Sequence, residues 1–127
     1  MDEKDDFVYI NHIVDAMEMI EEYTKHMKKE DFLHDKKTQD AVMREITVIG
    51  EATALLGDFF KSKYPDVPWA RMKGTRNRVV HGYFSVDLNI LWEIVSKDLP
   101  KLKKQLEELK GAKKFSSVEK AIKYLGE

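Results

Sequence analysis

The stretch with the clearest chemical potential covers residues 69–83 and reads WARMKGTRNRVVHGY. Arg76 precedes His81 by five residues in this stretch. Asn77 follows the arginine, and Tyr83 lies two residues after the histidine. A guanidinium holds a phosphate through its rigid fork of N–H donors, and an imidazole transfers protons near neutral pH. These residue types predict an anion-binding site that can also move a proton, with the amide of Asn77 as an orienting group.

The side chains of this stretch can be placed by assuming one continuous helix over about 68–81. Arg76 then falls in the middle of the apolar stripe, Asn77 and His81 lie one turn apart at its edge, and Arg78 faces water. A guanidinium cannot be deprotonated, and burying it without a partner costs several kcal/mol. Two interpretations remain open. Arg76 pairs with a buried carboxylate and His81 is a structural residue at a helix end, or Arg76 lines a pocket or subunit interface that receives an anion.

One geometric conflict accompanies the second interpretation. Arg76 and His81 are separated by about 140° on an ideal helix. The long arginine side chain could reach around the helix, the helix could be distorted near Gly82, or two copies of the motif could meet across a dimer interface. We favour the dimer, because it also explains an arginine within an apolar stripe.

The elements that must position these residues are helices. Apolar residues recur at three and four positions almost everywhere, which predicts helices over about 6–29, 38–62, 68–81 and 88–109 and no strand. Thr38 and Asp87 are the expected N-caps of the second and fourth helices. Pro100 is expected to kink the fourth helix because it removes a backbone hydrogen bond. Gly50 and Gly57 share one face of the second helix, which allows another helix to approach closely there.

The expected core positions follow from the same periodicity, and the predicted fold is an all-α bundle of four to five helices. The apolar positions of the first helix are Phe7, Ile10, Ile13, Val14, Met17, Ile20, Thr24 and Met27. Those of the second helix are Val42, Ile46, Ile49, Thr53, Leu56 and Phe60. Those of the fourth are Leu88, Trp92, Val95, Leu99, Leu102, Leu106 and Leu109.

Composition excludes several classes of protein. The chain has 127 residues, of which 43% are hydrophobic, which suits a single domain with its own core. It has no cysteine, so a disulfide scaffold, a zinc ribbon, an iron–sulfur site and a cysteine nucleophile are excluded. The net charge is −1, with acidic residues concentrated at the front and lysines at the back. The acidic start and the lack of a long apolar run predict a cytoplasmic protein without membrane association.

The chain divides into a bundle over 1–110 and a Lys-rich extension over 111–127. Ser116 and Glu119 form a capping-box pattern, which predicts a short last helix over 117–125.

The motif and its flanks resemble the HepT-like branch of the HEPN superfamily. The string RNRVVHGY over 76–83 matches the R-x4-H-x-Y motif of that branch. The flanks agree: PDVPW over 65–69 precedes the motif, and LWEIV over 91–95 with DLP over 98–100 follows it. The resemblance covers residues 7 to about 109.

The resemblance implies a small helical bundle that forms a homodimer and acts as a metal-independent ribonuclease on RNA. It implies a toxin whose cognate antitoxin is a minimal nucleotidyltransferase. Arg76 and His81 would be catalytic, Asn77 would orient the site, and Tyr83 would be the tyrosine that the antitoxin nucleotidylates. No cofactor or metal is expected.

Two other functions were weighed against this one. The chain could be a non-catalytic subunit that holds a nucleotide or substrate for a nucleotidyltransferase. A di-iron bundle is the more remote alternative, because it requires paired E-x-x-H units on facing helices. Glu22 and His26 have the wrong spacing for such a unit, and Asp31 with His34 is the one similar pair.

Overall fold

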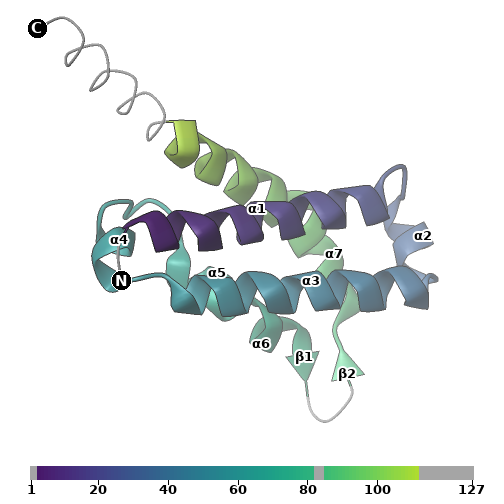
Figure 1. Cartoon of the computed structure of the whole chain (residues 1–127). Coiled ribbons are helices and arrows are strands. Elements are labelled where there is room, and N and C mark those ends of the chain that lie inside the picture. Colours follow the sequence, from purple (N-terminus) through teal and green to yellow (C-terminus); the bar gives the residue numbers. More distant parts are fainter. Residues whose placement is uncertain (1–2, 82–84, 112–127) are drawn as a thin grey trace, which may run out of the picture.

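Two long helices form the central hairpin of the fold, which a computed structural model describes over residues 3–81 and 85–111. Helix α1 (Glu3–Thr24) and helix α3 (Lys36–Leu55) lie side by side along most of their length (Figure 1). Each turns one apolar stripe inward, as the three-and-four spacing predicts. The six predicted core positions of α1 up to Ile20 are all buried, and so are the six predicted between Val42 and Phe60.

A short helix, α2 (Lys29–Leu33), connects the two long ones and was not predicted. Its Phe32 is fully buried and packs against Trp92, with 5.3 Å between the ring centroids. The N-cap of α3 is Asp35, whose carboxylate accepts hydrogen bonds from the Thr38 backbone N–H at 3.0 Å and from its hydroxyl at 2.8 Å. The prediction that Thr38 is the cap is therefore wrong, because it is the third residue of a helix that begins earlier.

The second predicted helix ends at Leu55 rather than near residue 62, and a separate helix, α4 (Asp58–Ser62), follows. In a continuous helix the Gly57 N–H would donate to the carbonyl of Thr53. It donates instead to the buried carboxylate of Asp6 on α1, at 2.9 Å. The hydrogen bond to Asp6 replaces the helical one and divides the predicted helix in two.

The third predicted helix is also divided. It forms α5 (Trp69–Lys73) and α6 (Thr75–Val79), and the chain then leaves the helix as β1 (Val80–His81). Strand β1 pairs antiparallel with β2 (Ser85–Val86), so the prediction of no strand is wrong by one small hairpin. The described chain is otherwise mostly helical with short connecting turns, in agreement with the all-α class.

The fourth helix begins as α7 (Leu88–Glu93), and Asp87 is its N-cap as predicted, accepting from the Asn89 and Ile90 N–H groups at 3.1 Å. A π-helical turn, η1 (Ile94–Asp98), follows, and the helix continues over 99–111. This wider turn ends two residues before Pro100, and the kink expected at Pro100 itself stays a prediction.

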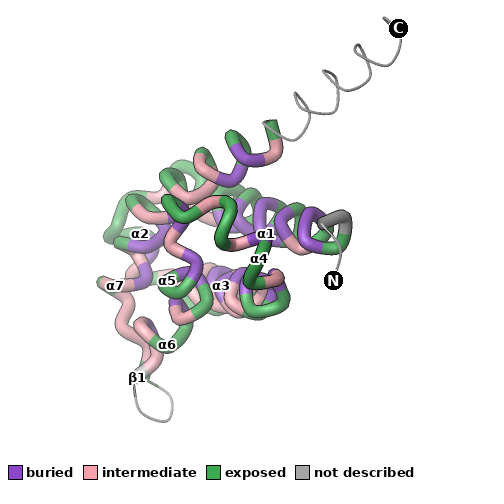
Figure 2. The backbone as a smooth tube through the Cα atoms, turned by 90° about the vertical axis from the view of Figure 1, so that its left-hand side faces the viewer, coloured by how far each residue is buried: buried purple, intermediate pink, exposed green. Residues whose placement is uncertain are grey.

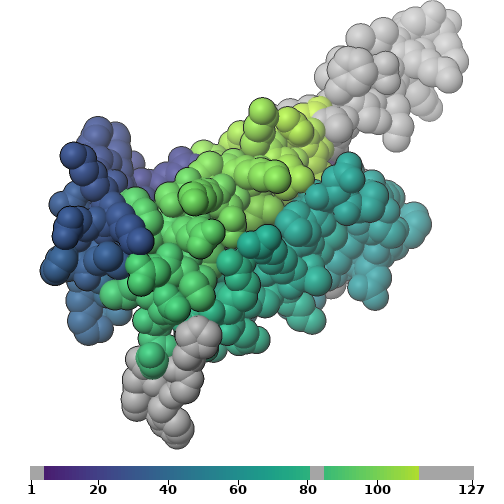
Figure 3. All heavy atoms as spheres, turned by 180° about the vertical axis from the view of Figure 1, so that it is seen from behind, coloured from purple at the N-terminus to yellow at the C-terminus, as the bar shows by residue number. Residues whose placement is uncertain are grey.

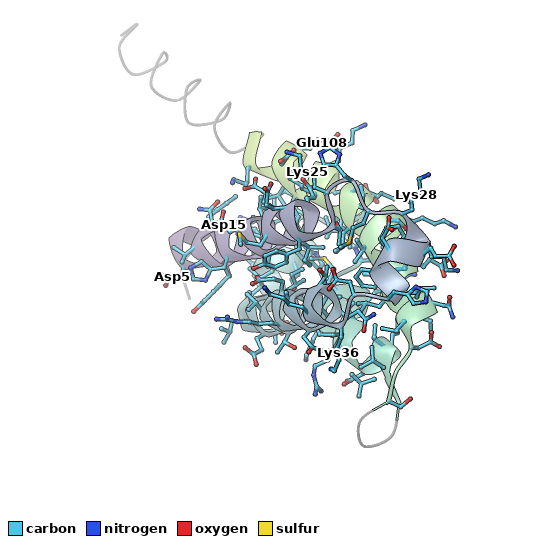
Figure 4. The ribbon with its side chains drawn as sticks, turned by 90° about the vertical axis from the view of Figure 1, so that its right-hand side faces the viewer. Asp5, Asp15, Lys25, Lys28, Lys36 and Glu108 are labelled. Carbon is cyan, nitrogen blue, oxygen red and sulfur yellow. The ribbon has the colours of Figure 1, made fainter. Side chains whose placement is uncertain are left out.

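The core lies between α1, α3 and the fourth helix, with the buried positions of each turned inward (Figure 2). Charged residues occupy the outside, where Asp15, Lys28 and Lys36 project from the bundle (Figure 4). No helix in the described ranges is long and apolar enough to cross a membrane. The predicted helix over 117–125 lies outside the described residues. The dimer remains a prediction.

Candidate functional site

The site begins at the break between α5 and α6. Gly74 separates the two short helices, with φ −91° and ψ 4°. The buried hydroxyl of Thr75 lies 2.9 Å from the Arg71 carbonyl oxygen and 3.0 Å from that of Met72, so it supplies a hydrogen bond to the end of α5. The close approach predicted at Gly50 is present here: a Cβ at this position would lie 3.2 Å from the Lys73 carbonyl oxygen. The missing side chain of Gly50 therefore lets α3 contact the backbone of Lys73, the residue directly before Gly74.

Arg76 and Asn77 lie on the outside of α6. The buried positions of this helix are Thr75 and Val79, and Arg76 and Asn77 are exposed. The prediction that Arg76 lies in the apolar stripe is therefore wrong, because the buried positions are Met72, Thr75 and Val79, three and four residues apart, and Arg76 lies beside them. The buried arginine that favoured a dimer at the sequence level does not exist in this fold.

His81 leaves the helix altogether. Its backbone is part of β1 and pairs with Ser85, while Val80 pairs with Val86. The helical wheel does not apply to it, so the 140° separation from Arg76 and the one-turn spacing from Asn77 are both wrong. The Asp87 N–H donates to the Val79 carbonyl at 2.8 Å and closes the base of the hairpin against α6. Gly82 and Tyr83 lie outside the described residues, as do Phe84 and everything after residue 111.

Arg78, which was predicted to face water, is only partly exposed, because it forms an ion pair. Its Nη1 lies 3.5 Å from Oδ2 of Asp98, and Nη2 of Arg71 lies 3.3 Å from the same oxygen. One carboxylate at the end of the π-helical turn thus joins α5 and α6 across the Gly74 break. On a helical wheel two positions seven residues apart, such as Arg71 and Arg78, lie within about 20° of each other, so a shared anionic partner could have been predicted. The identity of that partner could not, because Asp98 lies on a different helix.

A cleft of about 280 Å³ opens beside this ion-pair cluster, between α3, the α5–α6 segment and the fourth helix. Figure 3 shows this face of the molecule, with the fourth helix in green to yellow alongside the teal segment that contains α5 and α6. The apolar lining residues are Ile46, Ile49, Pro68, Met72, Ile94, Leu99 and Leu102. The polar and charged lining residues are Asp66, Arg71, Thr75, Arg78, Asp98, Lys101 and Gln105.

Arg76 and Asn77 do not line this cleft. On a helix, position 76 is about 160° from position 78. The motif thus carries two cationic faces: exposed Arg76 on one side of α6, and Arg78 with its carboxylate partner on the other. Arg76 and Asn77 are both exposed on α6, and the hairpin that carries the His81 backbone follows directly.

Two ionisable groups away from the site have shifted pKa values. Hydrogen bonds from the Thr38 backbone and hydroxyl lower the pKa of Asp35. A hydrogen bond to Glu21 raises the pKa of Lys103 and ties the fourth helix to α1. Within the described ranges, no group of three or more His, Cys, Asp or Glu side chains is arranged to hold a metal ion.

Comparison with known proteins adds to this geometry. Residues 13–109 match the family model described as "Ribonuclease HepT-like". A "probable ribonuclease HepT" of Thermococcus cleftensis is 44% identical over 102 residues, which is 80% of this chain and 93% of that protein. A "putative RNase" of Methanocaldococcus jannaschii is 36% identical over 107 residues, 84% of this chain and 98% of that one.

A longer M. jannaschii protein, a "gamma-glutamylcyclotransferase and putative RNase", is 46% identical over 103 residues, which cover 81% of this chain and 46% of its own length. No solved structure gives a significant match.

Proposed function

Because the chain belongs to the HepT-like ribonuclease family, we propose that it is a toxin-type endoribonuclease that cleaves RNA without a metal ion, with Arg76 and His81 as catalytic residues. The observation that carries this proposal is the placement of Arg76 and Asn77 on the exposed side of α6, directly before the hairpin that holds the His81 backbone. A large charged substrate can reach such a surface, whereas a buried arginine paired with a carboxylate could not bind it.

RNA supplies its own nucleophile, the ribose 2′-hydroxyl. In the proposed reaction the 2′-oxygen forms a bond to phosphorus while the bond from phosphorus to the 5′-oxygen breaks. His81 accepts the 2′-OH proton or donates a proton to the leaving 5′-oxygen, since an imidazole with a pKa near ~6.5 suits either role. Arg76 stabilises the charge on the pentacoordinate phosphorus. The products are a 2′,3′-cyclic phosphate and a 5′-hydroxyl.

The proposed enzyme acts as a homodimer. Arg76 and Asn77 do not line the cleft on this chain, and a catalytic surface needs a second wall to exclude water and hold the phosphate. A second copy would supply that wall, so that one active site contains residues from both chains. Mixing Arg76→Ala protein with His81→Ala protein tests this arrangement. A composite site restores cleavage in the mixed dimer, and a site contained within one chain does not.

Regulation follows from the partner that the family resemblance implies, a minimal nucleotidyltransferase antitoxin. Tyr83 is two residues past His81 in the chain, so a nucleotide attached to its phenol would place a phosphodiester near Arg76 and would block RNA. Co-expression with the partner should add the mass of one or more nucleotides to the wild-type chain. It should leave Tyr83→Phe unmodified and active.

The decisive experiment is an RNA cleavage assay in EDTA with protein that mass spectrometry shows to be unmodified. Arg76→Ala and His81→Ala are compared with Arg44→Ala, which removes an exposed arginine on α3. We expect cleavage that survives EDTA and leaves cyclic phosphate ends. The rate should fall about a hundredfold or more in the two motif variants and stay unchanged in the control. A folded, unmodified dimer that cuts none of several RNAs would instead favour a non-catalytic binding subunit of a nucleotidyltransferase.

A further inference from the structure

One end of the bundle exposes apolar side chains next to the point where the described chain stops. Among the exposed large apolar residues that the structure describes, Phe59 has the largest exposed fraction, 78%, and Leu55 is 51% exposed. Figure 1 and Figure 3 show α4 at the same end of the bundle as the last turns of the fourth helix. We propose that the chain's own residues 117–125 form an amphipathic helix that docks over Phe59 and the groove beside it. This docking does not depend on the proposed ribonuclease activity.

A groove of about 360 Å³ lies between the segment that follows α4 and the last turns of the fourth helix. Gln105 holds its two walls together, because its Nε2 donates to the Asp66 carbonyl oxygen at 3.1 Å. Lys63 lines the groove, and its Nζ lies 4.9 Å from the centroid of the Phe59 ring. The exposed ring therefore lies beside the groove. Leu109, on the wall formed by the fourth helix, is two residues before the end of the described chain.

The exposure of Phe59 follows from the way α4 packs. The next residue, Phe60, is buried, with its ring 5.3 Å from that of Phe7 and 5.2 Å from that of Tyr64. A helix that turns Phe60 into the core turns Phe59 about 100° away from it. A single exposed apolar residue is ordinary in a folded protein, so the proposal depends on a segment that fits this surface.

The sequence after the fourth helix has the pattern of a helix that needs such a surface. On a wheel of the expected helix 117–125, the residues Val118, Ala121, Ile122 and Leu125 fall within about 100° of one another. Isolated helices shorter than ~12–15 residues are only marginally stable in water, and the expected helix is shorter than that. We therefore expect it to form when its apolar stripe is covered.

Reach and charge select the chain's own tail as the occupant. The linker 112–116 spans at most about 18 Å, so a helix that follows it stays near this end of the bundle. Residues 112–127 carry four lysines and two glutamates, whereas the charged groups that line the groove are Asp66, Glu108 and Lys63. A net positive segment thus meets a net negative groove. The tail lies beyond residue 109, where the family match ends, so the docking is a property of this chain rather than of the matched family domain.

The test is an NMR experiment on the full chain. We expect nuclear Overhauser contacts between the Ile122 methyl groups and the ring protons of Phe59 and Tyr64. The backbone N–H groups of residues 121–125 should exchange with solvent about tenfold or more slowly than those of a synthetic peptide of residues 112–127. In Phe59→Ser and in Ile122→Ser, exchange should return to the rates of the peptide. The bundle itself stays folded in both variants, because Phe59 is exposed and Ile122 lies outside the bundle.

Two matched variants separate docking from a general loss of apolar surface. Met19→Ser removes an exposed apolar residue, 42% accessible, from the part of α1 that lies away from this end. Tyr124→Ser removes a large side chain that lies about 100° or more from Ile122 and Leu125 on the expected helix. Both variants should keep the slow exchange of the wild-type tail.

Spectra of a mixture of isotope-labelled and unlabelled chains identify the chain to which the docked tail belongs. Contacts within one chain support the proposal, and contacts between labelled and unlabelled chains overturn it in favour of a tail exchanged between copies. Tail N–H groups that exchange as fast as those of the peptide would also overturn it. So would equal exchange rates in Phe59→Ser and Met19→Ser.

Discussion

Replacing Asp98 by Asn tests whether one carboxylate holds the two halves of the motif segment together. Asn keeps the volume of the side chain and removes its charge. Asp98 pairs with Arg71 on one side of the Gly74 break at 3.3 Å and with Arg78 on the other side at 3.5 Å. Both pairs lose their electrostatic attraction in the variant. The α5–α6 segment would remain attached to the bundle through its own buried residues and through the contact between Gly50 of α3 and the Lys73 backbone.

The loss of stability expected in Asp98→Asn can be estimated from the exposure of the paired side chains. Ion pairs near the surface contribute about 0.2–1 kcal/mol each. The Arg71 side chain is 58% exposed, so its pair with Asp98 belongs at the low end of that range. Arg78 and Asp98 are 35% and 27% exposed, so their pair belongs near the upper end. The sum is about 1 kcal/mol, which for a domain of this size corresponds to a fall of about 4 °C in Tm.

The assay is thermal unfolding followed by circular dichroism, with Asp40→Asn as the matched control. Asp40 pairs with Lys36 at 3.2 Å, but their side chains are 67% and 84% exposed, so its loss should lower Tm by about 1 °C or less. High salt should reduce the difference in Tm between Asp98→Asn and wild type, because it screens the ion pairs. Equal Tm values for the Asp98 and Asp40 variants would refute the argument that Asp98 stabilises the break.

Further predictions concern two glycines and the N-cap of α3. Gly111→Ala should raise Tm, because alanine favours a helix over glycine by up to about 1 kcal/mol and nothing described lies within 4 Å of the new Cβ. Gly50→Ala should raise Tm by less than Gly111→Ala does, or lower it, because its Cβ would lie 3.2 Å from the Lys73 carbonyl oxygen. An equal rise in Tm for the two variants would contradict the close approach at Gly50. Asp35 has a lowered pKa, so its charge stabilises the fold above its unfolded pKa of about 3.9, and that contribution is lost as the pH falls through the folded pKa. The Tm difference between wild type and Asp35→Asn should therefore shrink between pH 6 and pH 2.5, and a constant difference would show that Thr38 does not stabilise the charged form.

The parts of the fold that depend on repeated signals were predicted from the sequence. Each long helix carries several apolar residues at three-and-four spacing, and a misplaced residue or two does not change such a pattern. Asp87 was found as an N-cap because it is the one capping residue directly before its helix. Asp35 was missed because Thr38 is also a capping type, and the choice depends on where the helix begins.

The break after Leu55 could not be predicted, because it depends on a contact from elsewhere in the chain. Asp6 is 51 residues from Gly57, and its carboxylate takes the N–H that would have continued the second helix. The burial of Arg76 was predicted wrongly because the wheel centred the apolar stripe too close to Trp69. The buried positions of α6 are Thr75 and Val79, which leave Arg76 at the surface.

The role of the motif in catalysis stays a prediction, whereas the geometry predicted for it was wrong. The residues of the motif suffice to suggest an arginine and a histidine acting on phosphate. Their arrangement depends on the hairpin that begins at Val80, which takes His81 off the helix. Asp98, the partner of Arg78, is 20 positions away and belongs to another helix.

The central claim is that Arg76 serves chemistry on an exposed surface and contributes little to the fold. The most direct test measures the RNA cleavage rate and the Tm of Arg76→Ala in the same preparation, with Arg44→Ala as the control. The account predicts a loss of about a hundredfold or more in rate with a Tm within about 2 °C of wild type, and no change in either quantity for Arg44→Ala. A rate that survives the Arg76 substitution, or one that falls only in step with Tm, would contradict it.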